Sequence, residues 1–242
     1  MDLRTIFTQR SAPGIMESMS NQAYLGVWCP SFPEDQILDR FGKFLATVPF
    51  SESQPGFTHV TIRAVDSTET PVFEQDLRSL PLDARSIVTL AQDYLHADSV
   101  YEVRCEWDLW TLETGAPKSQ SKPQPLEIFC HGEEYDGEFW RDSGHFYVDL
   151  GFEHLFTGHA RLLGFRTGEK APPQSAEERD FLTAMSWPEN LRAYKERTRE
   201  NIKKLFDWVR QIETAVGAER VRLWSEGEEN FEARLEEILA AR

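Results

Sequence analysis

Histidines and carboxylates concentrate between His131 and His159, a stretch that holds four of the chain's six histidines. Imidazole nitrogens and carboxylate oxygens are the usual ligands of hydrolytic zinc, iron and manganese. On an extended strand His145 and Asp149 would share one face, because side chains alternate. This pattern gives the hypothesis of a divalent metal site or an acid–base site. The alternative is a solvated acidic loop with histidines at its edge. The candidate ligands are His131, His145, Asp149, His154 and His159.

A cysteine with helix-terminus chemistry lies earlier in the chain, at Trp28-Cys29-Pro30-Ser31. A cysteine between a strand and a helix N-terminus has its thiolate favoured by the helix dipole. The order resembles the beginning of a thioredoxin-type motif, but Phe32 stands where the second cysteine belongs. Cys29 is therefore a candidate reactive thiol, with the alternative of a small buried apolar side chain.

Aromatic side chains form a third candidate, a groove for a ligand or a partner. Trp110 falls on the charged side of a predicted strand, where solubility does not require a wide ring. Rings on such a surface can line a ligand groove or anchor a partner. The alternative is that C-terminal helices cover that side. The groove residues are Trp110, Trp140 and Tyr147.

The common catalytic motifs are missing from the sequence. It contains no glycine-rich phosphate loop, no G-x-S-x-G, no H-E-x-x-H and no paired C-x-x-C. Their absence weighs against the commonest enzyme classes, although distant residues can still assemble a site.

One stretch, Ser99 to Leu112, organises the predicted architecture. Five apolar residues alternate with four charged ones, a period of two that predicts a strand with one covered and one polar face. A slip of one residue would bury the charges, so the register is firmly set. The apolar row is Tyr101, Val103, Cys105, Trp107 and Leu109, and the charged row is Glu102, Arg104, Glu106 and Asp108.

Patterns on either side of this strand give the order β-α-β-β-α-β over residues 22–112. That is the order of a ferredoxin-like domain, an α+β fold with an antiparallel sheet. Two further strands within residues 125–150 would widen the sheet. We therefore expect a sheet domain over residues 1–165, with Met1 to Asn21 irregular at its start.

The C-terminal part of the chain, residues 175–242, reads as a helical segment packed on the sheet domain. Arg166 to Gln174 is rich in glycine, proline and charge, which is typical of a linker. Serines followed three residues later by glutamate predict helix starts after Ser31, Ser175 and Ser186. Apolar residues at helical spacing then predict a long helix from Pro188 to Val216.

Bulk composition restricts the partners. The net charge of −15 should repel nucleic-acid phosphates and anionic lipid heads. No run approaches the length of apolar sequence that a membrane helix needs. Three cysteines without paired spacing, and no basic start followed by an apolar run, predict the cytoplasm. We therefore expect a protein partner with a basic surface, and neither nucleic acid nor membrane.

Three functional interpretations follow from these patterns. The first is a non-catalytic protein-interaction module, of the immunity or regulator type, with no cofactor. The second is a metal-dependent hydrolase that uses the His131–His159 region and a divalent ion. The third is a small-molecule sensor with a pocket between the sheet and the C-terminal helices. The sequence leaves the oligomeric state and the identity of any partner or substrate open.

Overall fold

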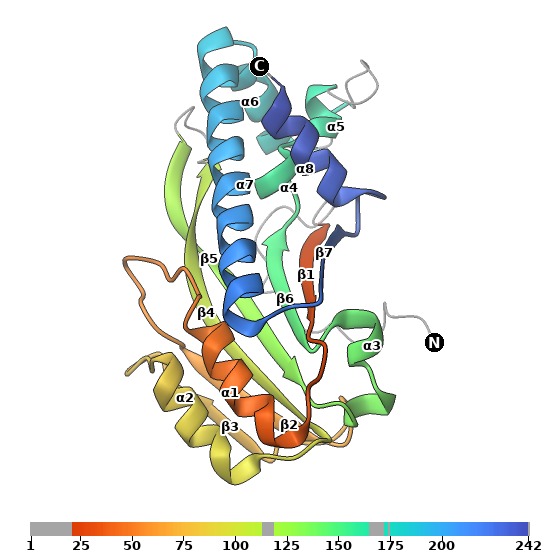
Figure 1. Ribbon diagram of the computed structural model, residues 1–242. Helices are drawn as coiled ribbons and strands as arrows, with labels where there is room; N and C mark the ends of the chain where they lie inside the picture. Colours follow the sequence, from red (N-terminus) through yellow and green to blue (C-terminus); the bar gives the residue numbers. More distant parts are fainter. Residues whose placement is uncertain (1–20, 113–118, 165–171, 174, 242) are drawn as a thin grey trace.

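The protein is an α+β molecule built on one seven-stranded antiparallel sheet (Figure 1). The computed structural model describes residues 21–112, 119–164, 172–173 and 175–241. The strands run in the order β3-β2-β4-β5-β6-β1-β7. They are β1 (Gln22–Trp28), β2 (His59–Ala64), β3 (Phe73–Asp76), β4 (Ser99–Leu112), β5 (Ser119–His131), β6 (Phe146–Phe152) and β7 (Arg220–Ser225).

The helices lie mainly on one side of this sheet (Figure 1). The long ones are α1 (Glu34–Leu45), α2 (Ala84–Ala91), α6 (Ala176–Met185), α7 (Pro188–Val216) and α8 (Phe231–Ala240). The short ones are η2 (Gln92–Tyr94), η3 (Tyr135–Gly137), α3 (Trp140–Ser143), α4 (His154–Thr157) and α5 (Ala160–Leu163). Every helix in the described part of the chain is too short or too polar to span a membrane.

The predicted strand Ser99–Leu112 is confirmed as β4, with the same bounds. Its apolar row faces the helices: Trp107 packs against Trp208 of α7, with ring centroids 5.6 Å apart. The charged row faces the other way. Every residue of the apolar row is at most 2% exposed, which agrees with a register set by burial.

The ferredoxin-like topology is wrong, although the β-α-β-β-α-β order along the chain is correct. A ferredoxin-like sheet places its first strand between its third and fourth. Here β5 and β6 lie between β4 and β1. The reason is the β4–β5 hairpin, which takes the edge of β4 that β1 would have used. The two added strands are therefore inserted in the middle of the sheet.

The strand β5 begins at Ser119, well before the predicted start at Pro125. Pro123 and Pro125 pair with Asp108 and Glu106 of β4. Their nitrogens point away from β4, and the pairing of β6 with β5 begins only at Glu127. Because no ladder bond is needed there, proline is tolerated as it is on an edge strand.

The long helix Pro188–Val216 is confirmed as α7 and crosses the covered face of the sheet (Figure 1). Its Ile202, Leu205 and Trp208 belong to the same buried cluster as the apolar row of β4. The chain then returns to the sheet as the edge strand β7. The core therefore contains residues of both predicted segments, the sheet domain and the C-terminal helical segment. Most of the expected linker, Arg166 to Gln174, lies outside the described residues, and so does the stretch from Met1 to Ser20.

The predicted helix starts have mixed outcomes. The hydroxyl of Ser175 accepts from the Glu178 amide at 3.1 Å and caps α6 as expected. The caps at Ser31 and Ser186 are wrong. Here α1 follows Pro33 and α7 follows Trp187, and neither residue forms a side-chain cap bond. Proline at the first position of α7 has no amide hydrogen, so that helix needs one fewer partner.

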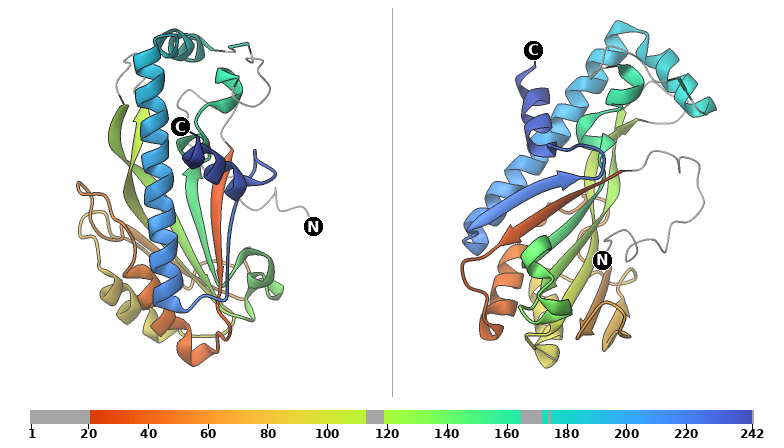
Figure 2. Two further views of the ribbon diagram at one scale, coloured as in Figure 1. Left: turned by 45° about the horizontal axis from the view of Figure 1, so that its top comes forward. Right: turned by 90° about the vertical axis from the view of Figure 1, so that its right-hand side faces the viewer.

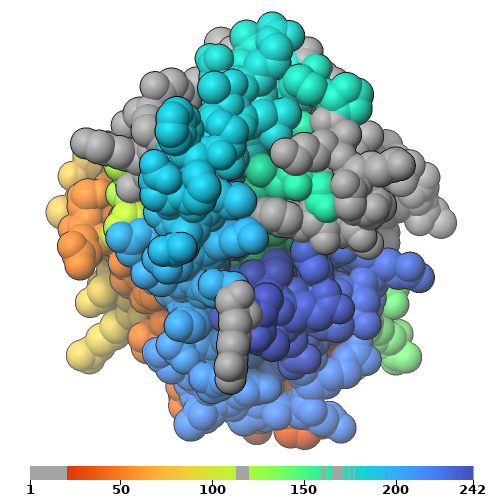
Figure 3. Space-filling view, turned by 90° about the horizontal axis from the view of Figure 1, so that it is seen from above, coloured from red at the N-terminus to blue at the C-terminus, as the bar shows by residue number. Residues whose placement is uncertain are grey.

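Among the described residues, the other side of the sheet has little helical cover. Figure 2 (right) shows α1 and α7 on one side of the strands, while on the other side, among the described residues, the short helix α3 lies against β1 and β6. We call this side the open face. Figure 3 shows the end of the molecule at which α6 packs on α5 and on α7, with α8 beside α7.

Candidate functional site

The histidines of the predicted metal site occupy two separate places. His131 and His145 lie at one end of β6, and His154 and His159 lie beyond its other end. Six residue steps along a strand separate these ends by about 20 Å. Asp149 lies between them, within the strand. The described residues contain no group of three or more His, Cys, Asp or Glu that could hold a metal ion.

His145 is packed between two rings. Its imidazole stacks on Trp140 and on Phe32, with centroids 4.3 and 4.5 Å away. Its Nδ1 accepts a hydrogen bond from the Cys29 amide at 3.0 Å, which places the proton of the neutral ring on Nε2. Burial lowers its pKa to about 4. His131 is similarly buried, with Nδ1 3.0 Å from the Gly144 carbonyl, and burial lowers its pKa to about 4.

His154 and His159 are the two predicted ligands whose rings the structure brings together. Their centroids are 4.6 Å apart. His159 Nδ1 lies 2.6 Å from the Tyr194 hydroxyl of α7. Burial lowers the pKa of His154 to about 3 and that of His159 to about 4. The pair therefore joins α4 and α5 to α7 as neutral rings at neutral pH.

Cys29 follows β1 and lies inside the core, 5% exposed. Burial raises the pKa of its thiol, and Arg40 opposes that shift only in part. The Cys29 amide occupies His145 Nδ1, so this imidazole nitrogen is not available as a base for the thiol. The thiol is therefore protonated at neutral pH. All three cysteines are buried and free.

The three predicted groove residues lie apart. Trp110 stacks under Arg197 of α7 at 3.8 Å, and its amide and carbonyl bond the side chain of Asn201. Trp140 belongs to α3, where it covers His145. Tyr147 is in the middle of the open face. They do not form one groove.

A cluster of rings surrounds Tyr147 on the open face. Tyr147 stacks on Tyr24 at 5.6 Å and lies 5.9 Å from Trp224 and 5.5 Å from Phe129. These four residues come from β1, β5, β6 and β7, and we call them the ring cluster. Gly26 makes their packing possible, because a β carbon there would lie 2.8 Å from Trp28 and 3.0 Å from Trp224.

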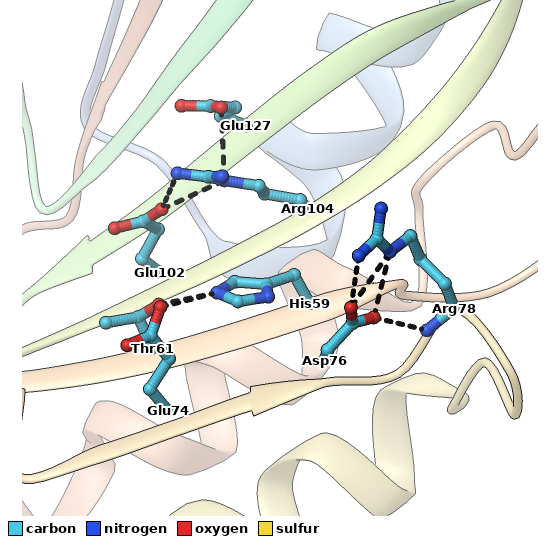
Figure 4. A network of polar contacts seen from close by, with 8 residues as sticks. All are labelled: His59, Thr61, Glu74, Asp76, Arg78, Glu102, Arg104 and Glu127. Atoms are coloured by element: carbon cyan, nitrogen blue, oxygen red, sulfur yellow. Dashed lines mark hydrogen bonds and ion pairs between the residues drawn. The ribbon is translucent and has the colours of Figure 1, made fainter. Parts of the chain in front are cut away.

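Carboxylates border the ring cluster. Strand register places Arg104, Glu127, Asp149, Tyr24 and Trp224 side by side in one row across β4, β5, β6, β1 and β7. Figure 4 shows Arg104 between two carboxylates, 2.7 Å from Glu102 and 3.1 Å from Glu127. On the described part of the sheet, Asp149 forms no ion pair.

The carboxylates of this row are partly buried. Burial raises the pKa of both Asp149 and Glu127, and the nearby charge of Glu226 adds to the rise at Asp149. The Oδ1 atom of Asp149 accepts from the Gly151 amide at 2.8 Å. Among the described residues, no donor reaches its Oδ2 atom. Asp149 is thus a half-buried carboxylate that is only partly satisfied.

Sequence reasoning found Tyr147 and Asp149 but missed Tyr24, Glu127 and Trp224. Each of these lies on a different strand, and only the order of the strands shows that they are neighbours. The alternation of β4 predicted a polar face, but it could not predict which strands would extend that face.

A comparison of the chain with protein-family models, with curated proteins and with solved structures finds no match. The residues themselves therefore carry the functional argument.

Proposed function

We propose that the protein is a non-catalytic interaction module whose open face docks on a basic surface of a partner protein. The observation that carries this proposal is the charge of that face. The three central strands β4, β5 and β6 present one base there, Arg104. They present five acids, namely Glu102, Glu106, Asp108, Glu127 and Asp149.

Tyr24 and Trp224, the half-buried rings that β1 and β7 contribute to the ring cluster, support the same proposal. Aromatic residues are enriched at the centres of protein interfaces, where they bury a large area with little loss of side-chain entropy. Opposite charges around such a centre steer association and select the partner. The covered face offers no comparable surface, because large side chains such as Trp107, Phe156 and Trp208 fill the space under α7 and are at most 1% exposed.

The other two interpretations gain no support from the structure. The metal-dependent hydrolase would need ligands that the fold separates along β6. The sensor would need a pocket where those large rings pack. We keep the cytoplasm as the expected location, which the three free, buried thiols support.

Binding of basic peptides to matched charge variants tests the proposal. The open-face variant combines Glu106→Gln, Asp149→Asn and Glu226→Gln. The control combines Glu213→Gln, Glu236→Gln and Asp93→Asn, all on exposed helical surfaces. Both variants change the net charge by the same amount, so long-range attraction changes equally.

An arginine- and lysine-rich peptide should bind the parent chain in calorimetry at low salt and weaken as salt rises. The open-face variant should bind about tenfold more weakly, and the control should match the parent. Equal loss in both variants would mean that only total charge matters, and the docking face would then be wrong.

A further inference from the structure

The connection between β5 and β6 forms a small lid, residues 133–143, whose helix α3 lies against β1 and β6 (Figure 2). The lid approaches β1 closely, since a β carbon on Gly26 would lie 2.5 Å from the Ser143 carbonyl oxygen. The Trp28 indole donates to the Arg141 carbonyl at 3.3 Å. Specific contacts therefore hold the lid on the sheet.

Unusual backbone conformations occur where the lid meets the turn after β2. Asp136 and Glu138 in the lid have φ angles of 47° and 67°, and Val65, directly after β2, has a φ of 71°. Val65 is β-branched, and for such a residue a positive φ is a genuine outlier. The Asp136 amide donates to the Val65 carbonyl at 2.8 Å, so two of these residues meet. Such strain persists only where surrounding contacts maintain it, and it favours release when a contact is lost.

His145 lies beneath the lid and is fixed as a neutral ring. Core residue Phe32 and lid residue Trp140 stack on its two sides, and His145 is 1% exposed. Its Nδ1 atom accepts from the Cys29 amide, so a second proton could bind only where the Cys29 hydrogen already points. Protonation therefore breaks this bond, and the ring must leave its position. Phe32 is buried and Trp140 is half-buried, so the ring reaches water by displacing Trp140 and with it the lid.

His131 also contacts the lid but responds to a proton differently. Its ring packs on lid residues Tyr135 and Phe139, with centroids 5.9 and 5.3 Å away. Its Nδ1 atom faces the Gly144 carbonyl, which can only accept, so the proton of the neutral ring is on Nδ1. A second proton binds Nε2 and leaves the bond to Gly144 intact. His131 is thus a natural control for His145, because it is similarly buried but has no hydrogen bond that protonation breaks.

The surroundings of His145 oppose a charge on the ring while the lid is closed. The charged and titratable groups of the described chain around it come from the lid, β5, α1 and the end of β1, namely Glu133, Arg141, His131, Arg40 and Cys29. Burial lowers the pKa of His145 most, and His131 and Arg40 lower it further. Glu133 Oε1 lies 3.7 Å from Nε2, beyond hydrogen-bond distance. A ring that has reached water escapes burial, so acid favours the displaced ring.

We infer that the lid is an acid-sensitive device and that His145 is its latch, through the bond between its Nδ1 atom and the Cys29 amide. At neutral pH the ring stays between Phe32 and Trp140, and the lid stays on β1 and β6. In acid the protonated ring leaves the Cys29 amide, the lid opens and the backbone at Asp136 relaxes. This inference concerns the chain alone and does not depend on the docking proposal.

Hydrogen exchange of the lid amides in the full chain tests the inference. The Ser143 and Gly144 amides donate to the carbonyls of Phe139 and Trp140 and report on a closed lid. Their protection, corrected for the intrinsic exchange rate, should fall about tenfold per pH unit from about pH 6.5 to 4, because opening frees a buried imidazole to take up a proton. Amides of β4 should stay at least about a hundredfold more protected. Equal protection of lid and β4 at every pH would mean that the lid opens only when the whole chain unfolds, and the inference would be wrong.

His145→Asn and His131→Asn are the matched variants. The asparagine oxygen can accept from the Cys29 amide at position 145, and the asparagine nitrogen can donate to the Gly144 carbonyl at position 131, but neither group takes up a proton near neutral pH. Both variants lose a buried ring, so the dependence on pH is compared rather than the absolute protection. His145→Asn should remove most of the acid dependence of lid protection, and His131→Asn should keep most of it. The reverse result would overturn the latch.

Imidazole ¹⁵N shifts of the parent chain keep the test decisive if His145→Asn leaves the lid open at every pH. At neutral pH they should place the proton of His145 on Nε2 and that of His131 on Nδ1. The His145 signals should then change over the same pH range in which lid protection is lost. A proton on Nδ1 of His145 at neutral pH, or a lid that opens while His145 stays neutral, would contradict the inference.

Discussion

The two faces of the sheet carry different kinds of side chain, with opposite effects on stability. The covered face buries Trp107, Phe156 and Trp208 under α7, with few polar groups. The open face keeps rings and carboxylates together, including half-buried acids whose pKa burial raises. The first arrangement is what stability requires. The second costs stability, and this difference is what we expect if the open face serves recognition, as we propose.

The largest expected contrast comes from one tryptophan on each face. Trp208→Ala should lower the free energy of unfolding by about 3–5 kcal/mol, because it removes a buried ring and its bond to the Thr47 hydroxyl. Trp224→Ala, on a half-buried edge strand, should cost about 1 kcal/mol. Urea unfolding monitored by circular dichroism measures both. Equal losses would mean that the ring cluster is an ordinary part of the core.

Acid should destabilise the protein through its buried histidines. In the folded chain His131 and His145 have pKa values lowered to about 4, against about 6.5 when unfolded. Between these values the unfolded chain binds more protons, so stability is full above about pH 6.5 and is lost as the pH falls toward 4.

The open-face acids act in the opposite direction. Because their folded pKa is raised, Asp149 and Glu127 lower stability at neutral pH, and their protonation in acid relieves that cost. Asp149→Asn should therefore make the loss of stability in acid steeper, as measured by urea midpoints across the pH range. Stability that stays constant from pH 7 to about pH 5 would contradict the assignment of neutral, buried histidines.

The junction between α7 and the sheet should have an intermediate effect. Asn201 bonds the amide and the carbonyl of Trp110 and also the Leu155 carbonyl, where β4 extends beyond β2. Asn201→Ala leaves these backbone groups without their partner and should cost about 1–3 kcal/mol. Gln211→Ala, exposed on the same helix, is the matched control and should have no measurable effect in the same unfolding experiment.

The smallest expected effect is the most informative about the open face. Asp149→Asn should leave the melting temperature at pH 7 unchanged or raise it, because the amide removes a half-buried charge and keeps the bond to Gly151. Thermal melts by circular dichroism decide this. A clear loss of stability would make Asp149 a structural residue.

The sequence predicted elements better than it predicted their neighbours. The bounds of β4 and α7 follow from periodicity, because burial acts on each element separately. The position of β1 beyond β6 depends on which strand edges remain free, and no local pattern records that. For the same reason Tyr147 and Asp149 were identified, whereas their neighbours Tyr24 and Trp224 were not.

The most direct test of the docking face is a map of where a basic peptide binds. Amide chemical shifts of the ¹⁵N-labelled chain would be recorded with and without an arginine-rich peptide at low salt. We predict that the shifted amides lie in β1, β5 and β6 around Asp149 and the ring cluster, and that those of α1, α2 and α7 remain in place. Shifts concentrated on the helices, with the open face unchanged, would contradict the account.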